Sequence, residues 1–160
     1  MEGHFVTLQY CLPPSTADIV GTSIPEYHLR SRGYLLDSNI VIDLMASETE
    51  LPLTSLVVWI SVISIVELSR SRVLTSFEID TYLKSYLHAD ISIVDLEMAH
   101  QARFIRSYTA LKVPDALIAA TAELKNLTLV TEDRQLSRVA GSNVINRETF
   151  MQRMENEDER

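Results

Sequence analysis

The chain has 160 residues, the usual length of one domain and enough to bury a hydrophobic core. With 46% hydrophobic and 22% charged residues its composition is that of a soluble globular protein, no apolar run approaches the ~20 residues of a membrane span, and the start lacks a secretory signal. The single cysteine, Cys11, excludes an internal disulfide, so we expect a cytoplasmic protein with no membrane association.

The net charge of −8 argues against strong nonspecific binding to nucleic acid, because phosphate binding normally requires lysine and arginine. The charge is unevenly distributed: residues 1–33 carry −1, residues 34–154 carry −4 and residues 155–160 carry −3. A charge of −4 is that of four carboxylates, which two divalent cations would cancel. The acidity is therefore compatible with a phosphodiester substrate bridged by metal ions.

The pattern divides the chain into three parts. Residues 1–33 show no sustained hydrophobic period, only residues 4–12 could form a strand there, and we treat this part as an N-terminal extension of unknown role. Residues 34–150 alternate between strand and helix patterns, and residues 151–160 are a strongly acidic C-terminal tail.

Within residues 34–150 the periodicity predicts a regular alternation of elements. In chain order these are a strand at 35–36, a helix at 39–47, a strand at 56–62, helices at 63–73 and 76–88 (with Ser76 as N-cap of the latter), a strand at 91–94, helices at 96–108 and from Pro114 to 126, a strand at 127–131, a helix at 133–140, an edge strand at 143–145 and a last helix. Strands separated by helices need crossover connections, so we expect an α/β fold with a central parallel sheet covered on both faces.

Two aspartates follow predicted strands. Asp37 comes directly after 35–36, and Asp133 comes two residues after 127–131. In open parallel sheets ligands bind at the carboxyl ends of the strands, so both lie where a site is expected. An aspartate at the end of a strand is also a common N-cap of the following helix, and each position alone allows that interpretation.

Two further acids stand out by their surroundings. Glu67 lies in a strongly apolar stretch, so its charge must be paired, bind a metal or lie on a solvated face with Ser64 and Arg70. Asp115 follows Pro114 in the first turn of a predicted helix, where an acid also favours the helix dipole.

Together the four acids indicate a metal site. Hard cations such as Mg²⁺ take oxygen ligands, and two such ions could activate water and stabilise the leaving oxygen in phosphodiester cleavage. Other kinds of site have less support: the sequence has no glycine-rich phosphate loop, no Gly-x-Ser-x-Gly, no plausible Cys/His pair, and no zinc-ligand spacing among its histidines, which are His4, His28, His88 and His100.

The order and flanks of the acids resemble the motifs of the PIN-domain family, over about residues 34–150. The four motifs are Leu35-Leu-Asp-Ser-Asn-Ile-Val-Ile-Asp-Leu44, Ser61-Val-Ile-Ser-Ile-Val-Glu-Leu68, Lys112-Val-Pro-Asp-Ala-Leu-Ile-Ala-Ala-Thr-Ala122 and Leu129-Val-Thr-Glu-Asp-Arg-Gln-Leu136. The third motif is the most specific, and the chain most resembles VapC-type toxins of toxin–antitoxin pairs.

The resemblance implies a three-layer α/β/α fold and a Mg²⁺- or Mn²⁺-dependent endoribonuclease. Carried over by motif, Asp37, Glu67, Asp115 and Asp133 become the catalytic, metal-binding acids. Asn39 and Thr131 occupy positions of small polar residues that support the cluster, whereas Asp43 is not a site position and is expected on the surface. The expected partners are RNA as substrate, a cognate antitoxin and a second copy of the chain in a homodimer.

Two other interpretations remain open: a PIN-like binding module with weak or no catalysis, and a stand-alone nuclease that processes RNA or DNA. A set of arginines could contact phosphate or simply lie on solvated helix faces: Arg70, Arg72, Arg103, Arg106, Arg134 and Arg138.

Overall fold

The computed structural model describes residues 33–52, 57–69, 75–139 and 143–158. The expectations for residues 1–32, Cys11 and the strand at 4–12 among them, concern residues outside these ranges, as do those for Arg70 and Arg72.

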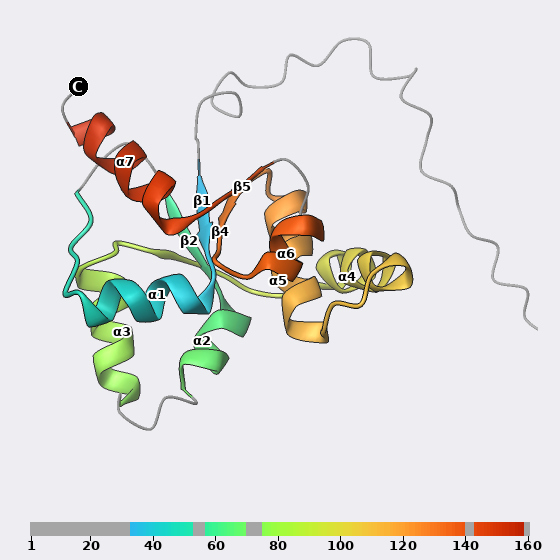
Figure 1. The fold of residues 1–160 in the computed structure, drawn as a ribbon. Coiled ribbons are helices and arrows are strands. Elements are labelled where there is room, and N and C mark those ends of the chain that lie inside the picture. The colour runs from blue at the N-terminus through green and yellow to red at the C-terminus, as the bar shows by residue number, and fades with distance from the viewer. Residues whose placement is uncertain (1–32, 53–56, 70–74, 140–142, 159–160) are drawn as a thin grey trace, which may run out of the picture. The chain divides into compact units, whose positions relative to one another are not determined.

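Five parallel strands form one sheet (Figure 1). They are β1 (Tyr34–Leu36), β2 (Val58–Ser61), β3 (Asp90–Ser92), β4 (Thr128–Val130) and β5 (Val144–Ile145), and their order across the sheet is β3-β2-β1-β4-β5. β1 is central and pairs with β2 on one side and β4 on the other. All three residues of β1 are buried, as expected of a strand covered on both faces.

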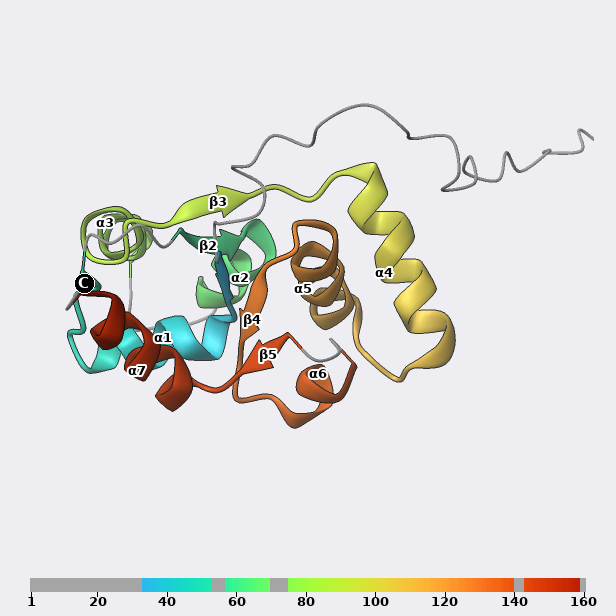
Figure 2. The same cartoon turned by 90° about the horizontal axis from the view of Figure 1, so that it is seen from above.

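The helices are α1 (Ser38–Ala46), α2 (Val62–Leu68), α3 (Ser76–Ser85), α4 (Leu96–Tyr108), α5 (Val113–Leu124), α6 (Arg134–Val139) and α7 (Arg147–Asp158). Seen from above, α1, α3 and α7 lie on one side of the sheet, and α4, α5 and α6 lie on the other (Figure 2). This is the three-layer α/β/α arrangement, so the predicted fold class is confirmed.

The alternation of side chains along β1 divides the core into two clusters. Tyr34 and Leu36 point to the cluster that contains the buried residues of α1, α3 and α7. Leu35 points to the opposite cluster, which is built mainly from α5 and completed by Ala102 and Ile105 of α4. Each face of the sheet therefore has its own hydrophobic core.

The structure differs from the sequence prediction at the start of α3. The N-cap is Thr75 rather than Ser76, so the predicted cap was wrong by one residue. Thr75 and Glu78 form a reciprocal capping box, in which Oγ1 of Thr75 accepts from the Glu78 amide at 3.3 Å and Glu78 accepts from the Thr75 amide at 2.7 Å. The glutamate three residues after Thr75 decides the cap, because Ser76 has no such partner.

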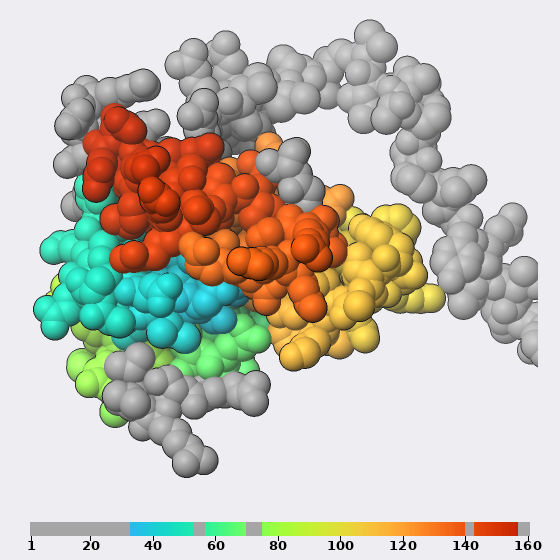
Figure 3. Space-filling view, in the orientation of Figure 1, coloured from blue at the N-terminus to red at the C-terminus, as the bar shows by residue number. Residues whose placement is uncertain are grey.

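The C-terminal region contributes to the core. The acidic stretch that begins at residue 151 continues helix α7, in which Phe150 and Met154 are buried. The Phe150 ring packs edge-on against Tyr34 of β1 with 5.1 Å between centroids. In the space-filling view the side chains of α7 lie directly against those of α1 (Figure 3). The acidic composition thus marks the outer face of a packed helix.

Within the described ranges, no helix is both long and apolar enough to cross a membrane.

The packing of α7 predicts a large loss of stability in Phe150→Ala. Removing a fully buried phenylalanine should lower the free energy of unfolding by about 3–5 kcal/mol, because it removes apolar contacts and leaves a cavity. The control is Phe77→Ala, since Phe77 is 79% exposed and its loss should change stability by less than about 0.5 kcal/mol. Urea unfolding followed by circular dichroism measures both, and equal midpoints for the two variants would contradict this packing.

Candidate active site

The order of the strands locates a crevice. From β1 the sheet continues through β2 and β3 on one side and through β4 and β5 on the other, so β1 and β4 flank the point where the order reverses. Ligands of open parallel sheets bind at the carboxyl ends of the strands at such a point. Asp37 directly follows β1 and Thr131 directly follows β4, and the Asp37 amide donates to the Val130 carbonyl at 3.0 Å. Both residues therefore lie at the crevice.

Asp37 is held there by three donors. It is only 6% exposed, and its Oδ1 accepts from the Ser38 amide at 2.7 Å as the N-cap of α1. Its Oδ2 accepts from the Thr131 hydroxyl at 2.7 Å and from the Asn39 amide group at 2.9 Å. The cap and the predicted supporting contacts therefore occur together, with one carboxylate oxygen used for each.

Glu67 comes to the same place from α2. Its side chain is half-buried, and its Oε2 accepts a hydrogen bond from the Ser38 hydroxyl at 2.9 Å. α2 begins directly at the end of β2, which is the neighbour of β1, so the helix starts at the carboxyl edge of the sheet. The apolar residues around Glu67 belong to the packed faces of α2: Leu68 is fully buried and Ile65 packs against the core.

Asp133 is exposed and caps α6. Its Oδ1 accepts from the amides of Gln135 and Leu136 at 2.6 and 3.0 Å, and its own amide donates to Oγ1 of Thr131 at 3.0 Å. The N-cap interpretation of this residue is thus correct, and the cap leaves Oδ2 outside these two bonds. Thr131 connects the backbone of Asp133 to the carboxylate of Asp37.

Asp115 lies in the first turn of α5, half-buried. Because α5 leads back to the start of β4, its own first turn lies toward the carboxyl edge of the sheet. Burial raises the pKa of Asp115, and the negative charges of Asp133 and Asp37 raise it further against the lowering effect of Lys112.

Asp37 shows the same electrostatics. Burial raises its pKa above the ordinary value, while the hydrogen bonds from Thr131 and Ser38 lower it. The charges of Glu67 and Asp133 raise it again. Asp37, the N-cap of α1, therefore lies close enough to Glu67, Asp115 and Asp133 for mutual repulsion, and Asp115 lies close enough to Asp133.

This donor set suits a hard cation that keeps much of its water. Among the described residues no three His, Cys, Asp or Glu side chains are arranged so that they could hold an ion by themselves. Mg²⁺ usually binds through one or two carboxylates, several waters and substrate phosphate, and it rarely has an all-protein cage. The chemistry of the acids fits such an ion, and a zinc-like closed shell does not fit this part of the chain.

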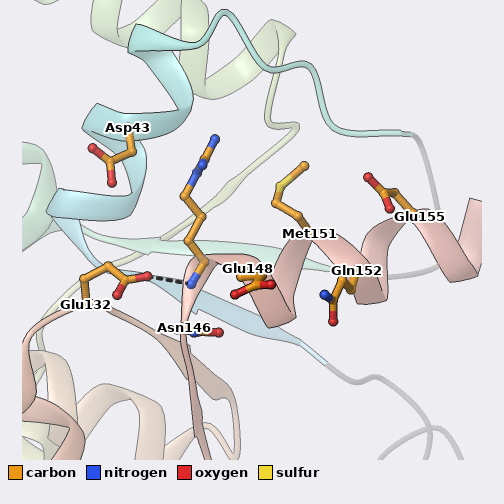
Figure 4. A pocket seen from close by; sticks show the side chains of 8 residues that line it. Asp43, Glu132, Asn146, Glu148, Met151, Gln152 and Glu155 are labelled. Carbon is orange, nitrogen blue, oxygen red and sulfur yellow. Dashed lines mark hydrogen bonds between the residues drawn. The ribbon is translucent and has the colours of Figure 1, made fainter.

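Asp43 lies apart from this hydrogen-bond network. It is exposed on α1 and lines a surface pocket of about 590 Å³, whose other walls are Glu132, Asn146 and residues of α7 (Figure 4). Oε1 of Glu132 accepts from the Arg147 amide at 3.0 Å, so the loop that carries Asp133 is tied to the start of α7.

The candidate phosphate-binding arginines within the described ranges are all exposed: Arg103, Arg106, Arg134 and Arg138. Arg106 uses its Nε to bond the Leu111 carbonyl at 3.2 Å. Arg134 directly follows Asp133 in the chain, which makes it the member of the set nearest to the acids in sequence.

Sequence reasoning missed Ser38. It follows Asp37 in the first motif, and nothing in the local pattern shows that its hydroxyl reaches Glu67, which lies 29 residues further along the chain. The only available signal was its small, polar character at the first position of a helix beside an acid.

Comparisons with known proteins identify the family of this chain. The PIN-domain model matches residues 34–142. No curated protein matches the chain at a significant level. Several solved structures share the fold at low identity.

A structure of PAE2754 from Pyrobaculum aerophilum has a TM-score of 0.60 at 22% identity and covers 78% of this chain and 96% of its own. DNA-bound VapBC from Salmonella typhimurium has a TM-score of 0.58 at 21% identity, covering 72% and 98% respectively. A toxin–antitoxin complex from Klebsiella pneumoniae has a TM-score of 0.53 at 22% identity, covering 71% and 97%.

The matched region contains the whole acid cluster and more than half of the chain. The chain therefore belongs to the PIN-domain family, whose members are nucleases that generally use divalent metals.

Proposed function

We propose that this protein is a Mg²⁺- or Mn²⁺-dependent endoribonuclease that hydrolyses RNA phosphodiester bonds in the cytoplasm as the toxin of a toxin–antitoxin pair. The observation that carries the proposal is the convergence of Asp37, Glu67, Asp115 and Asp133 at the carboxyl edge of the sheet, where burial and like charge raise the pKa values of Asp37 and Asp115. Divalent cations would neutralise the charge of such a cluster.

The residues divide the work as follows. Asp37 and Asp115, the two acids with raised pKa values, and Asp133 would hold the cations, and Glu67 would ligate or orient the attacking water. Bound there, a divalent cation would supply a more acidic water and charge neutralisation at the phosphate and the leaving oxygen. Thr131 and Asn39 fix the orientation of Asp37 through their hydrogen bonds to Oδ2.

The partners in this proposal are RNA, a cognate antitoxin and a second copy of the chain. Structural neighbours with the same fold include a toxin–antitoxin complex, which supports the choice of partner. An arginine of the antitoxin would find matching charge at the acids, since guanidinium groups pair with carboxylates in two parallel hydrogen bonds. A homodimer is expected from the resemblance to VapC-type toxins.

One observation favours a second candidate, a binding module with little catalysis. Asp37 and Asp133 both already serve as helix caps, and the described acids do not form a ready-made ion cage. In that case the cluster would chiefly receive a cationic partner. Metal-dependent cleavage separates the two candidates.

The first prediction from the site concerns catalysis by Asp115→Asn. The substitution should lower Mn²⁺-dependent RNA cleavage by roughly 100-fold or more, since loss of one metal-holding charge removes several kcal/mol of transition-state stabilisation. The matched control is Asp43→Asn, which removes an exposed aspartate from α1 and should keep wild-type rates. A titration of Mg²⁺ and Mn²⁺ with each protein measures this, and full activity of Asp115→Asn would refute the assignment.

The raised pKa of Asp37 predicts how stability depends on pH without metal. A carboxyl with a raised folded pKa stabilises the fold below its unfolded pKa, about 3.9, and that contribution is lost as pH rises through the folded value. As pH rises from 4 to 7 in EDTA, the melting temperature of Asp37→Asn should therefore rise relative to that of wild type. Asparagine keeps the N-cap of α1 but loses an acceptor for Thr131 and Asn39, so the change of the difference with pH, and not its size at one pH, reports the charge.

Added metal should raise the melting temperature of wild type relative to that of Asp37→Asn. Mn²⁺ stabilises wild type by mass action and stabilises Asp37→Asn less, each kcal/mol shifting the midpoint by about 2–4 °C in a chain of this size. Differential scanning calorimetry measures the melting temperatures with Mn²⁺ and in EDTA. A difference in melting temperature between wild type and Asp37→Asn that stays constant from pH 4 to pH 7 in EDTA would contradict the repulsion.

The choice of substrate predicts a third result. With Mn²⁺ present, single-stranded RNA or transfer RNA should be cut, whereas DNA of the same sequence should stay intact. A parallel assay on all three, resolved on denaturing gels, tests this. Equal cleavage of DNA would instead support the stand-alone nuclease.

A further inference from the structure

One serine hydrogen-bonds the carboxylates of two acids that come from different helices. The Ser38 amide donates to Oδ1 of Asp37 at 2.7 Å, and its hydroxyl donates to Oε2 of Glu67 at 2.9 Å. Within the described ranges no other residue bonds the carboxylates of two of the four acids. Ser38 is therefore the only direct link between the α1 and α2 parts of the cluster in that part of the chain.

The position of Ser38 is fixed by the start of α1. Ser38 is the first residue of α1, and its amide is held by the cap that Asp37 forms, so the position of its side chain follows from the start of the helix. Glu67, in contrast, has a long side chain near the end of α2. Among the described residues, its carboxylate accepts one hydrogen bond, the one from Ser38. The hydrogen bond from Ser38 therefore orients the longer side chain of Glu67.

The link also opposes a repulsion. The charge of Glu67 raises the pKa of Asp37, so the two carboxylates lie close enough to disfavour each other. A hydroxyl that donates to a carboxylate makes a charge-assisted hydrogen bond, which is stronger than one between neutral groups. Without it, Glu67 would gain by turning away from Asp37 toward solvent.

We propose that Ser38 is a positioning residue for Glu67. By holding Oε2 it leaves Oε1 outside that hydrogen bond, free to bind a cation or its water. This inference rests on the proposed function for the role of the metal, whereas the Ser38–Glu67 link itself can be tested in metal-free protein. Ser38 touches neither substrate nor reacting atoms in this arrangement.

The test compares four proteins: wild type, Ser38→Ala, Ser38→Thr and Ser69→Ala. Ser38→Ala keeps the hydrogen bond from the backbone amide of residue 38 to the Asp37 carboxylate and removes only the hydroxyl. Ser38→Thr restores a hydroxyl. Ser69→Ala removes an exposed hydroxyl from the end of α2 that bonds only the Val66 carbonyl among described groups, so it serves as the matched control.

The first readout is Mn²⁺ binding, measured by isothermal titration calorimetry without RNA. Loss of a residue that orients a metal ligand typically weakens metal affinity or activity by about 10–100-fold, and we expect a weakening of about 10-fold or more for Ser38→Ala. Ser38→Thr and Ser69→Ala should stay close to wild type. In cleavage assays the loss in Ser38→Ala should appear in kcat, with KM for RNA little changed.

The second readout is a double-mutant cycle with Glu67→Ala in EDTA. Ser38→Ala should change the thermal midpoint when Glu67 is present and leave it unchanged when Glu67 is already alanine, because residues in direct contact have non-additive effects. Additive effects, or wild-type Mn²⁺ affinity in Ser38→Ala, would overturn the proposal. If wild type neither binds Mn²⁺ nor cleaves RNA, the proposed function fails, and the cycle still decides whether Ser38 holds Glu67.

Discussion

Mutual repulsion between carboxylates at the carboxyl edge of β1 and β4 is the constraint on which the rest of the site depends. Asp37 is almost fully buried, and two other acids raise its pKa. Such charges are costly to bury unless they are hydrogen-bonded or neutralised. The fold meets part of that cost with hydrogen bonds from Thr131, Asn39 and Ser38. In the proposed function a cation would meet the remainder, and stability without metal would be exchanged for metal affinity.

Two acids of the candidate site also stabilise the fold locally. Asp37 caps α1 and Asp133 caps α6, so removing either side chain would disturb a helix start as well as a charge. A proposed role as a metal ligand is compatible with the cap, because a carboxylate has two oxygens. Oδ1 of Asp37 accepts from the amide of the helix, while Oδ2 lies among the side chains of Thr131 and Asn39. Sequence reasoning leaves open whether Asp37 is a helix cap or a metal ligand, and the structure shows that the cap does not exclude the second role.

Periodicity predicted the elements well where the segment is long and amphipathic. α4 begins and ends at the predicted residues, and the alternation of strands and helices predicted the parallel sheet. Local chemistry decided what periodicity could not: two adjacent residues were both good caps for α3, and only Thr75 has a glutamate three residues later. The acid cluster was not predicted from periodicity. Its four members were chosen because their order in the chain matches the motifs of the PIN-domain family. The contact between Ser38 and Glu67 joins two helices and depends on tertiary packing, so no local pattern predicts it.

The acidic composition of the C-terminal residues suggests a tail, whereas α7 packs against the core. The helix begins after the region that matches the PIN-domain model, and its outer face is acidic. Its inner face nevertheless supplies Phe150 to the core beside Tyr34, the first residue of β1. Its first amide also bonds Glu132, whose own amide reaches Oδ1 of Asn39 at 3.5 Å. The loop between β4 and α6 is thus held from both sides, by α7 and by the start of α1. Because Thr131 and Asp133 lie in that loop, the geometry of the acids depends on a helix outside the matched region.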